Sequence, residues 1–473
     1  MARGAGSTDG RGRAWTGAAA ALALALLWSA EARADLTHDT VSGRAIERVS
    51  LRAGRGEPKP TAWADLSAPK APGPYTIRFV ATGEAVLVPH CAGRKRVLVD
   101  GVPKDAGSKG PLVLRVGDEA PREITIEVEV SAYEKRIACS GPPRVGAVVR
   151  TTDGLSTMRF ESPHAKKGGG EAVVFVPGGH DRSKPSAVLV GAHPWNGSPW
   201  TYAAYEELLD EAGKRDVVLL MPSGLGNSLY VADAEDEVMR AIDALAGELA
   251  IDRQRVSIWG ASMGGAGATT IAFHRPDRFA FVASFFGDSR YDLGTYVKSI
   301  LVDERGARRV NALDVVENAR HLPVFLVHGE QDRVSPLVQS TMLESAMKKA
   351  GFSVELERVP GMGHEAPLVV KYIRRVVERA STAVAPRRPS RVSFRSVRAI
   401  DTEAYGVRLV RAPSADVDRE AFVDVERRSD GVHVLAASGV SEIVLAKDAL
   451  GCNGEEPVKI DVPGSKVVVR WAP

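Results

Sequence analysis

Apolar and polar positions follow one pattern in the first third of the chain. Between residues 35 and 150 they alternate in short runs, as in Tyr75–Val80 and Glu123–Val130. A period of two residues puts neighbouring side chains on opposite faces and predicts β-strands. Glycine, proline and aspartate separate these runs, as expected of turns. We therefore predict an all-β, jelly-roll-like sandwich domain over residues 35–150.

Residues 151–384 have a different pattern, in which nearly continuous apolar runs alternate with helical spacing. The expected strands are Ala172–Pro177, Ala187–Gly191, Val217–Pro222, Val256–Trp259, Phe281–Phe286, Pro323–His328 and Val354–Val359. Val238, Ile242 and Leu245 recur at helical spacing within Glu235–Ala250. Strands that are apolar on both faces predict a mainly parallel sheet covered by helices on both sides. Chemistry on such a sheet is expected in loops at the carboxyl ends of its strands.

A segment rich in proline and arginine, Ala385–Pro389, follows the last helical pattern. Alternating runs then return, for example in Ala421–Glu426 and Val467–Trp471. These features predict a boundary and a small all-β C-terminal domain over residues 385–473. The expected architecture is an α/β domain flanked by two all-β, sandwich-like domains.

The first 34 residues are typical of a secretory signal peptide. Three arginines precede the apolar stretch Gly17–Trp28, and Ala32-Arg33-Ala34 offers a small-x-small cleavage site after Ala34. The apolar stretch is shorter than the roughly 20 residues that span a membrane comfortably. We expect a secreted or periplasmic protein with no stable membrane span after cleavage. An uncleaved anchor is the alternative.

The net charge and the cysteine content indicate which ligands and cross-links are expected. The chain has 62 basic and 59 acidic side chains, a net charge of +3 that disfavours nucleic-acid binding. No cysteine and histidine spacing resembles a zinc site, so neither a metal nor a cofactor is expected. Cys91 and Cys139 could form a disulfide that leaves Cys452 over, but three free thiols are an equally open alternative.

One pentapeptide, Gly260-Ala261-Ser262-Met263-Gly264, carries the strongest chemical signal. It follows the expected strand Val256–Trp259 and precedes the small-residue run Gly265–Ala268. A strand, a tight turn and a helix start would expose the Ser262 hydroxyl at the apex. The glycines fit because a side chain at their positions would collide with the strand or the helix.

A serine nucleophile needs a general base and a group that orients this base. His364 follows the expected strand that ends near Val359, and Asp332 follows the one that ends at His328. The order Ser262, Asp332, His364 is that of the α/β-hydrolase fold. We predict a nucleophile, an orienting carboxylate and a general base in turn. Asp288, at the end of an earlier strand, is the rival acid.

Two backbone N–H groups are needed to stabilise the oxyanion. Met263, directly after the nucleophile, is one expected donor. The other is expected in the loop Ala192–Gly197, where Pro194 has no N–H, so Trp195 is predicted.

Other residues near these motifs allow more than one interpretation. His193 is as well explained by a structural role as by a catalytic one, and His328 is expected to be buried structure. Trp195, Trp200 and Tyr202 form an aromatic cluster that fits either core packing or a substrate platform.

The residues around Ser262, with GASMGGAGATTIAFHRP, PVFLVHGEQDRVSP and GFSVELERVPGMGH, resemble the catalytic domain of the prolyl oligopeptidase (S9-like) and secreted polyester or feruloyl esterase branch of α/β hydrolases. The resemblance covers about half of the chain and implies the triad Ser262, Asp332 and His364. The branch's peptidases carry a seven-bladed propeller, which about 115 residues of short strands cannot form. The last β segment is similar to a small module of some secreted bacterial members.

These observations favour a secreted serine hydrolase that cleaves a small-molecule or polymeric carboxylic ester through an acyl-enzyme intermediate. A serine peptidase of the prolyl oligopeptidase type is the first alternative. A catalytically inactive carbohydrate- or surface-binding protein is the second. The sequence leaves the oligomeric state open.

Overall fold

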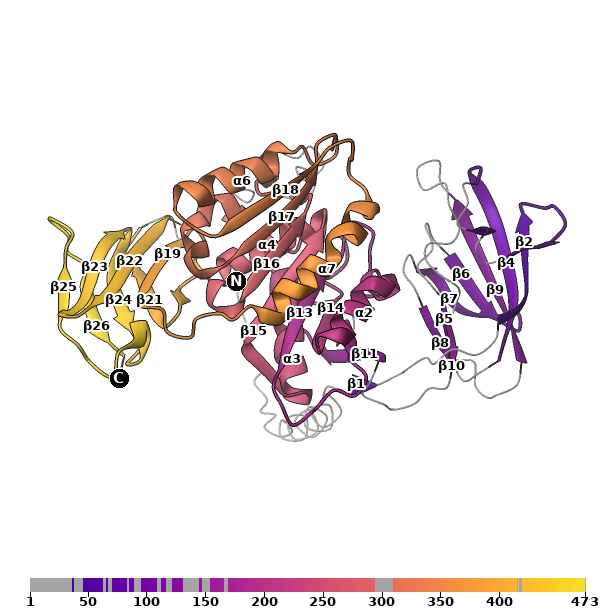
Figure 1. Cartoon of the computed structure of the whole chain (residues 1–473), viewed down its shortest axis with the longest axis horizontal. Coiled ribbons are helices and arrows are strands. Elements are labelled where there is room, and N and C mark those ends of the chain that lie inside the picture. Colours follow the sequence, from indigo (N-terminus) through magenta and orange to yellow (C-terminus); the bar gives the residue numbers. More distant parts are fainter. Residues whose placement is uncertain are drawn as a thin grey trace, which may run out of the picture.

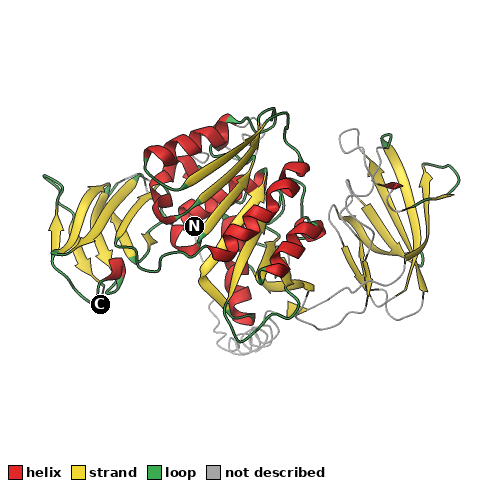
Figure 2. Cartoon of the chain, in the orientation of Figure 1, coloured by secondary structure: helices red, strands yellow, loops and turns green. Residues whose placement is uncertain are grey.

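The computed structural model describes residues 36–37, 46–62, 65–66, 70–82, 85–88, 95–108, 112–115, 121–130, 144–146, 154–165, 169–293, 309–414, 416 and 419–472. Figure 1 shows a helix-covered sheet with β-rich parts before and after it in the sequence, and Figure 2 shows that almost all helices belong to this middle part. The signal-peptide prediction for residues 1–34 and the pairing of Cys91 with Cys139 concern residues outside this description. Cys452 is a free, buried thiol.

The middle part is built on one nine-stranded sheet. In spatial order its strands are β1 (Leu36–Thr37), β11 (Gly154–Glu161), β12 (Gly169–Val176), β14 (Val217–Pro222), β13 (Ser186–Ala192), β15 (Ile251–Ala261), β16 (Phe281–Phe285), β17 (Val324–Gly329) and β18 (Val354–Val359). The strands from β14 to β18 are parallel, and the first three pair antiparallel. The mainly parallel sheet was predicted from the apolar runs. The antiparallel β1, which adds residues 36–37 to this sheet, was not.

Helices cover both faces of the sheet because its central strands are apolar on both faces. On one face, α3 (Asp233–Glu248), α4 (Met263–His274) and α6 (Val338–Lys349) contribute Ile242, Ile271 and Leu343 to one core. On the other face, α2 (Glu206–Lys214) and α7 (Ala366–Thr382) contribute Leu208 and Ile373 to a second core.

The strand order reverses at one point of the sheet, beside β13. After β13 the chain crosses to β14 on one side, and it then returns to β15 on the other side of β13. The loops that leave the carboxyl ends of β13 and β15 therefore diverge, which is where parallel α/β sheets bind ligands.

The N-terminal part contains two antiparallel sheets. One has the order β3 (Lys59–Pro60), β2 (Ile46–Ala53), β4 (Gly73–Thr82), β9 (Pro121–Val130), β6 (Lys95–Val99), β7 (Val102–Ser108), and the other β10 (Arg144–Gly146), β5 (Ala85–Val88), β8 (Leu112–Arg115). Ile77, Ile124 and Ile126 are fully buried members of its core, as the alternation predicted. The packing of the two sheets as a sandwich stays a prediction.

The C-terminal part contains two four-stranded sheets that share one hydrophobic core. One consists of β19 (Arg391–Ser396), β22 (Ala421–Arg428), β23 (Gly431–Ser438) and β25 (Val458–Ile460), and the other of β20 (Glu403–Ala404), β21 (Val407–Arg411), β24 (Val440–Leu445) and β26 (Val468–Trp471). Phe394 from the first sheet and Ile443 from the second are completely buried in this core. Among the described residues, no helix has the length and apolar character that crossing a membrane requires.

A buried cluster of charged side chains joins the C-terminal sheets to the helix-covered sheet. Arg398 donates to Glu235 at 2.6 Å and to Asp401 at 2.8 Å, and Arg275 donates to Glu235 at 2.9 Å. His274, at the end of α4, lies 2.7 Å from Asp401. Burial by itself would raise the pKa of Asp401, but the neighbouring His274 and Arg398 hold this pKa well below its usual range. Asp401 is therefore an ionised group at the centre of the contact.

We expect Asp401→Asn to lower the free energy of unfolding at pH 7 by about 3 kcal/mol, because it breaks a buried, paired charge. The folded state holds Asp401 at a lowered pKa, so its contribution is complete above the unfolded pKa of about 4 and is lost as the pH falls below it. The difference in thermal stability between wild type and variant should thus shrink between about pH 5 and pH 2.

Thermal melting at a series of pH values measures this difference. Glu403→Gln, at an exposed position of β20, is the matched control and should follow the wild type throughout. If the difference in melting temperature between Asp401→Asn and wild type did not change with pH, the conclusion that Asp401 is ionised in the folded state would be contradicted.

Candidate active site

Ser262 stands at the sharp turn between β15 and α4. Its backbone has φ = 56° and ψ = −121°, a left-handed conformation that costs free energy for a residue with a side chain. The amide of Ser262 donates to Phe285 O at 2.9 Å, which ties the turn to the neighbouring strand β16. The strand, turn and helix predicted from the pentapeptide are those observed.

The glycines on either side of the turn are required by close packing. A Cβ at Gly264 would lie 1.8 Å from the carbonyl oxygen of Ala192, and one at Gly260 would lie 2.4 Å from the backbone of Gly264. These contacts involve backbone atoms, which cannot move away as a flexible side chain could. The turn therefore packs directly against the end of β13, where the loop with Trp195 begins.

We expect Gly264→Ala to push the end of β13 away from the turn. The extra methyl should destabilise the fold by about 2 kcal/mol or more. It should also lower kcat by a factor on the order of 100, because the loop beside Ser262 is displaced. Melting temperature and single-substrate kinetics measure both effects. Gly213→Ala, in α2, is the control because nothing lies within 4 Å of its added Cβ. Equal melting temperatures and equal kcat values for the two variants would contradict the close packing of Gly264 against β13.

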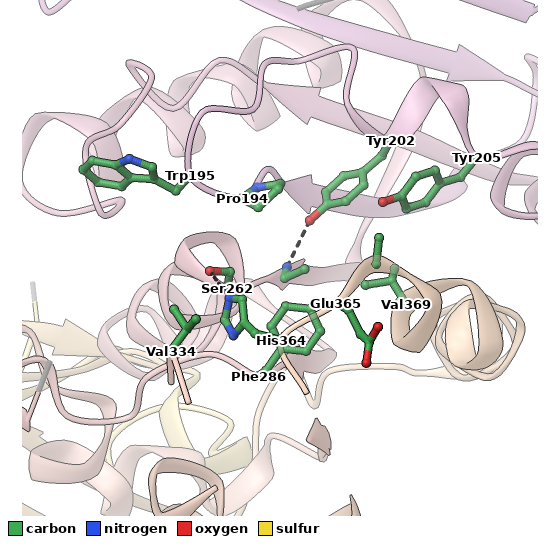
Figure 3. Close-up of a pocket in the computed structure, with 12 residues that line it drawn as sticks. Pro194, Trp195, Tyr202, Tyr205, Ser262, Phe286, Val334, His364, Glu365 and Val369 are labelled. Atoms are coloured by element: carbon green, nitrogen blue, oxygen red, sulfur yellow. Dashed lines mark hydrogen bonds between the residues drawn. The ribbon is translucent and has the colours of Figure 1, made fainter. Parts of the chain in front are cut away.

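The structure brings Ser262, His364 and Asp332 into one chain of hydrogen bonds (Figure 3 shows Ser262 and His364). The Ser262 hydroxyl donates to His364 Nε2 at an Oγ to Nε2 distance of 2.8 Å. His364 Nδ1–H donates to Asp332 Oδ2 at 2.7 Å. A carboxylate only accepts, so it fixes the tautomer in which Nε2 of His364 is free to take a proton.

Asp332 is held as a carboxylate by several donors. Its other oxygen, Oδ1, accepts from the amides of Val334 at 2.8 Å and Ser335 at 2.9 Å. Burial would raise the pKa of Asp332, but hydrogen bonds from His328 and His364 and the amide of Val334 hold this pKa well below its usual range. Asp332 therefore stays charged at any pH near neutrality.

The loops that carry Asp332 and His364 pack tightly together beyond β17 and β18. Gln331 N donates to Met362 O at 2.9 Å, and a Cβ at Gly329 would lie 2.4 Å from that same carbonyl oxygen. The ring of Phe286 covers His364 with its centroid 4.5 Å away. These contacts hold the imidazole in the orientation that its two hydrogen bonds require.

Two amides beside Ser262 are candidates for an oxyanion site. Met263 is the first residue of α4, and the first amides of a helix have no partner within the helix. In the loop after β13, His193 N donates to the Tyr230 hydroxyl at 2.7 Å, and Pro194 has no N–H. Trp195 N has no hydrogen-bond partner among the described residues. Among the described residues, the amides of the predicted pair, Met263 and Trp195, are thus without another hydrogen-bond partner.

Two buried tyrosines support this arrangement, and the sequence did not assign them this role. The Tyr202 hydroxyl donates to Ala192 O at 2.8 Å and accepts from Ala261 N at 3.0 Å, which ties the end of β13 to the residue before Ser262. Tyr230, as described, holds His193. Of the predicted aromatic cluster, Trp200 and Tyr202 are buried in the core, and Tyr202 and Trp195 line the cavity beside Ser262.

The other histidines and the rival acid have structural partners. His193 is buried and lies 2.8 Å from Ser223 O through Nε2, and burial lowers its pKa. His328 is fully buried, as predicted, and lies 2.8 Å from Ser340 Oγ through Nδ1. Asp288 accepts a hydrogen bond from the Ser335 hydroxyl at 2.6 Å, while the Nδ1 position of His364 is taken by Asp332.

A cavity of about 540 Å³ opens beside Ser262. It is lined by Pro194, Trp195, Tyr202, Tyr205, Ala261, Ser262, Phe286, Val334, His364, Glu365, Ala366 and Val369. Figure 3 shows Trp195, Pro194, Tyr202 and Tyr205 along one side and Ser262, His364, Phe286 and Val369 along the other. The walls are mostly aromatic and aliphatic. Within the described ranges, no group of three or more histidine, cysteine or acidic side chains is placed to hold a metal.

The chain is similar to known proteins over about half of its length. Residues 228–381 match the prolyl oligopeptidase family. An uncharacterized protein of Mycobacterium tuberculosis is 27% identical over 228 residues, which are 46% of this chain and 72% of that protein.

Solved structures similar to this chain include an S-formylglutathione hydrolase of Agrobacterium tumefaciens, with a TM-score of 0.44, 20% identity, and coverage of 50% of this chain and 98% of that one. Another is the acylaminoacyl peptidase of Pyrococcus horikoshii, with a TM-score of 0.43, 18% identity, and coverage of 50% of this chain and 42% of that one. Residues 228–381, which contain Ser262, Asp332 and His364, are thus similar in sequence to the prolyl oligopeptidase family.

Proposed function

We propose that the protein hydrolyses carboxylic esters through an acyl-enzyme intermediate on Ser262. The observation that carries this proposal is the continuous hydrogen-bond chain from Ser262 through His364 to Asp332 beside an apolar cavity. In this arrangement the serine has both a base in contact with its proton and a charged group that orients this base.

The proposed reaction proceeds in two halves. Ser262 Oγ attacks the ester carbonyl carbon while His364 Nε2 takes the hydroxyl proton, and the amides of Met263 and Trp195 donate to the oxyanion. Collapse of this intermediate breaks the bond to the alcohol oxygen, which receives the proton from His364. Water then attacks the acyl group, with His364 as base, and releases the acid and the free serine. Asp332 stabilises the imidazolium in both halves.

Two features favour an ester over a peptide. The cavity walls beside Ser262 offer few polar groups to pair with a peptide backbone, whose unpaired donors and acceptors are costly to bury. The described N-terminal strands form two antiparallel sheets, with no radial blade arrangement that would filter peptides. A serine peptidase of the prolyl oligopeptidase type is the second candidate, because the family match includes this class. We further propose that residues 1–34 direct export and are removed after Ala34.

The test is a comparison of substrates on the wild-type protein. A fluorophosphonate probe should label the protein, and a panel of short p-nitrophenyl esters should be hydrolysed faster than peptide anilides. Cleavage of peptides without cleavage of esters would replace the ester proposal by the peptidase. Absence of labelling on folded protein would leave a non-catalytic binding protein as the better explanation.

A further inference from the structure

Asp332 lies between two histidines. On the cavity side, its Oδ2 accepts from His364 Nδ1 at 2.7 Å, and the other ring nitrogen of His364 accepts from the Ser262 hydroxyl. On the interior side, Nε2 of His328 faces the same Oδ2 at 3.5 Å, and its Nδ1 lies 2.8 Å from Ser340 Oγ. Each imidazole ring thus has the shared carboxylate near one nitrogen and a serine hydroxyl at the other.

The position of the proton on His328 follows from its partners. Nε2 lies 2.8 Å from Ser335 O, and a carbonyl oxygen only accepts, so Nε2 carries a proton. Nδ1 can then accept from the Ser340 hydroxyl. The ring is therefore held at both nitrogens, and its Nε2–H group lies between Ser335 O and the carboxylate of Asp332.

Asp332 depends on its donors because its side chain is fully buried. An ionised carboxylate has about four acceptor positions. Two amides bind Oδ1, and His364 occupies one position of Oδ2. Among the described residues, His328 is the other donor that faces Oδ2. Loss of this donor would leave part of a buried charge without compensation, which favours a rotation of the carboxylate away from His364.

Ser335 connects His328 to Asp332 by a second route. Its carbonyl oxygen accepts from His328 Nε2 at 2.8 Å, and its amide donates to Asp332 Oδ1 at 2.9 Å. His328 belongs to β17, and Ser340 belongs to α6. The loop that carries Asp332 is therefore tied through His328 to a central strand and to a helix.

We propose that His328 is a positioning residue, which holds the Asp332 carboxylate in the orientation that accepts from His364. The inference rests on the proposed ester hydrolysis, because it concerns the same triad. His328 does not line the cavity, so its effect on the reaction passes through Asp332. We therefore expect its replacement to change kcat and to leave KM unchanged, since the orienting carboxylate acts in the transition state.

The test compares two substitutions that keep different contacts. The amide nitrogen of glutamine can take the place of Nε2, so His328→Gln keeps a donor toward Ser335 and Asp332. Asparagine is too short to reach them and keeps only the contact with Ser340. We expect His328→Asn to lower kcat for p-nitrophenyl esters by a factor on the order of 100, the effect of a displaced catalytic group. His328→Gln should recover most of this loss.

A double-mutant cycle separates positioning from a general loss of structure. In protein that already carries Asp332→Asn, His328→Asn should have almost no further effect on kcat, because the group that it positions is gone. If His328→Asn does not fold, Ser340→Ala replaces it in the cycle and should lower kcat only while Asp332 is present. An equal loss of kcat in both backgrounds, or an equal loss in His328→Gln and His328→Asn, would overturn the positioning role.

His180→Asn is the matched control. This histidine is also buried between a serine and an aspartate, with Nε2 3.0 Å from Ser186 Oγ and Nδ1 2.7 Å from Asp216 Oδ1. Ser186 begins β13, at the edge of the sheet opposite to Ser262, so this variant should lower the melting temperature without changing kcat.

A loss of kcat in His180→Asn as large as that in His328→Asn would also overturn the inference, because the loss would then follow from burial alone. Hydrolysis of no ester by wild-type protein, together with no fluorophosphonate labelling, would instead overturn the proposed function and this inference with it.

Discussion

Replacement of Ser262 by alanine should lower kcat for p-nitrophenyl esters by at least about 10⁴-fold and abolish fluorophosphonate labelling. The reason is that in the proposed reaction Ser262 supplies the atom to which the acyl group is transferred, and no other hydroxyl of the described residues is hydrogen-bonded to His364 Nε2. Alanine lacks only the side-chain oxygen of serine and keeps the Cβ, which the turn already accommodates. We therefore expect the melting temperature to change little.

Ser257 provides a control on β15, the strand that leads to Ser262. Its hydroxyl is fully buried and has no hydrogen-bond partner in the described part of the chain, so Ser257→Ala removes an unsatisfied polar atom. This variant should keep wild-type kinetics and should be at least as stable, since an unpaired buried hydroxyl is unfavourable. Loss of activity in Ser257→Ala, or labelling that persists in Ser262→Ala, would show that the nucleophile is elsewhere.

Replacement of Asp332 by asparagine should lower kcat by a factor on the order of 10⁴ while the fold stays intact. An amide in place of the carboxylate can donate to His364 Nδ1, which favours the tautomer whose Nε2 carries a proton and cannot act as base. It also removes the charge that stabilises the imidazolium. Because the pKa of Asp332 is held well below its usual range, the wild-type carboxylate is ionised from mildly acidic to alkaline pH. The loss should therefore be nearly the same across this interval.

Asp288→Asn is the matched comparison, because Asp288 was the rival acid. Asparagine can still accept the hydrogen bond from the Ser335 hydroxyl through its side-chain oxygen. We expect this variant to stay within about 10-fold of wild type, as the Ser335 amide that supports Asp332 keeps its place. Measuring kcat of both variants between pH 5 and pH 9 tests which of the two carboxylates orients His364. An equal or larger loss in Asp288→Asn would give the orienting role to that residue.

The sequence predicted the parts of the site that depend on strand ends and on backbone sterics. Near-continuous apolar runs located β13, β15 and β17, and the mixed run Val354–Val359 located β18. Parallel strands bring their carboxyl ends to one edge. The glycines around Ser262 indicated a crowded turn, and the structure identifies the atom that crowds it as Ala192 O.

The remaining features depend on contacts that no local pattern reveals. Tyr230 meets His193 across 37 residues of sequence, and Arg398 meets Glu235 across 163 residues. Phe286 reaches the cavity because it adopts φ = 41° directly after β16, a conformation that an ordinary strand pattern does not predict.

The helix α4 connects the turn at Ser262 with the C-terminal part of the chain, which the sequence predicted as separate regions. It begins at Met263, beside Ser262, and ends at His274, whose ring binds Asp401 in the segment between β19 and β20. The C-terminal part of the chain therefore contacts the C-terminal end of α4, and the N-terminal end of this helix lies at Ser262. A ligand held on the C-terminal sheets would keep a constant orientation toward Ser262, unlike the cargo of a module on a flexible tether. Positions on that surface can therefore be used as fixed reference points for measuring how a long substrate approaches the cavity.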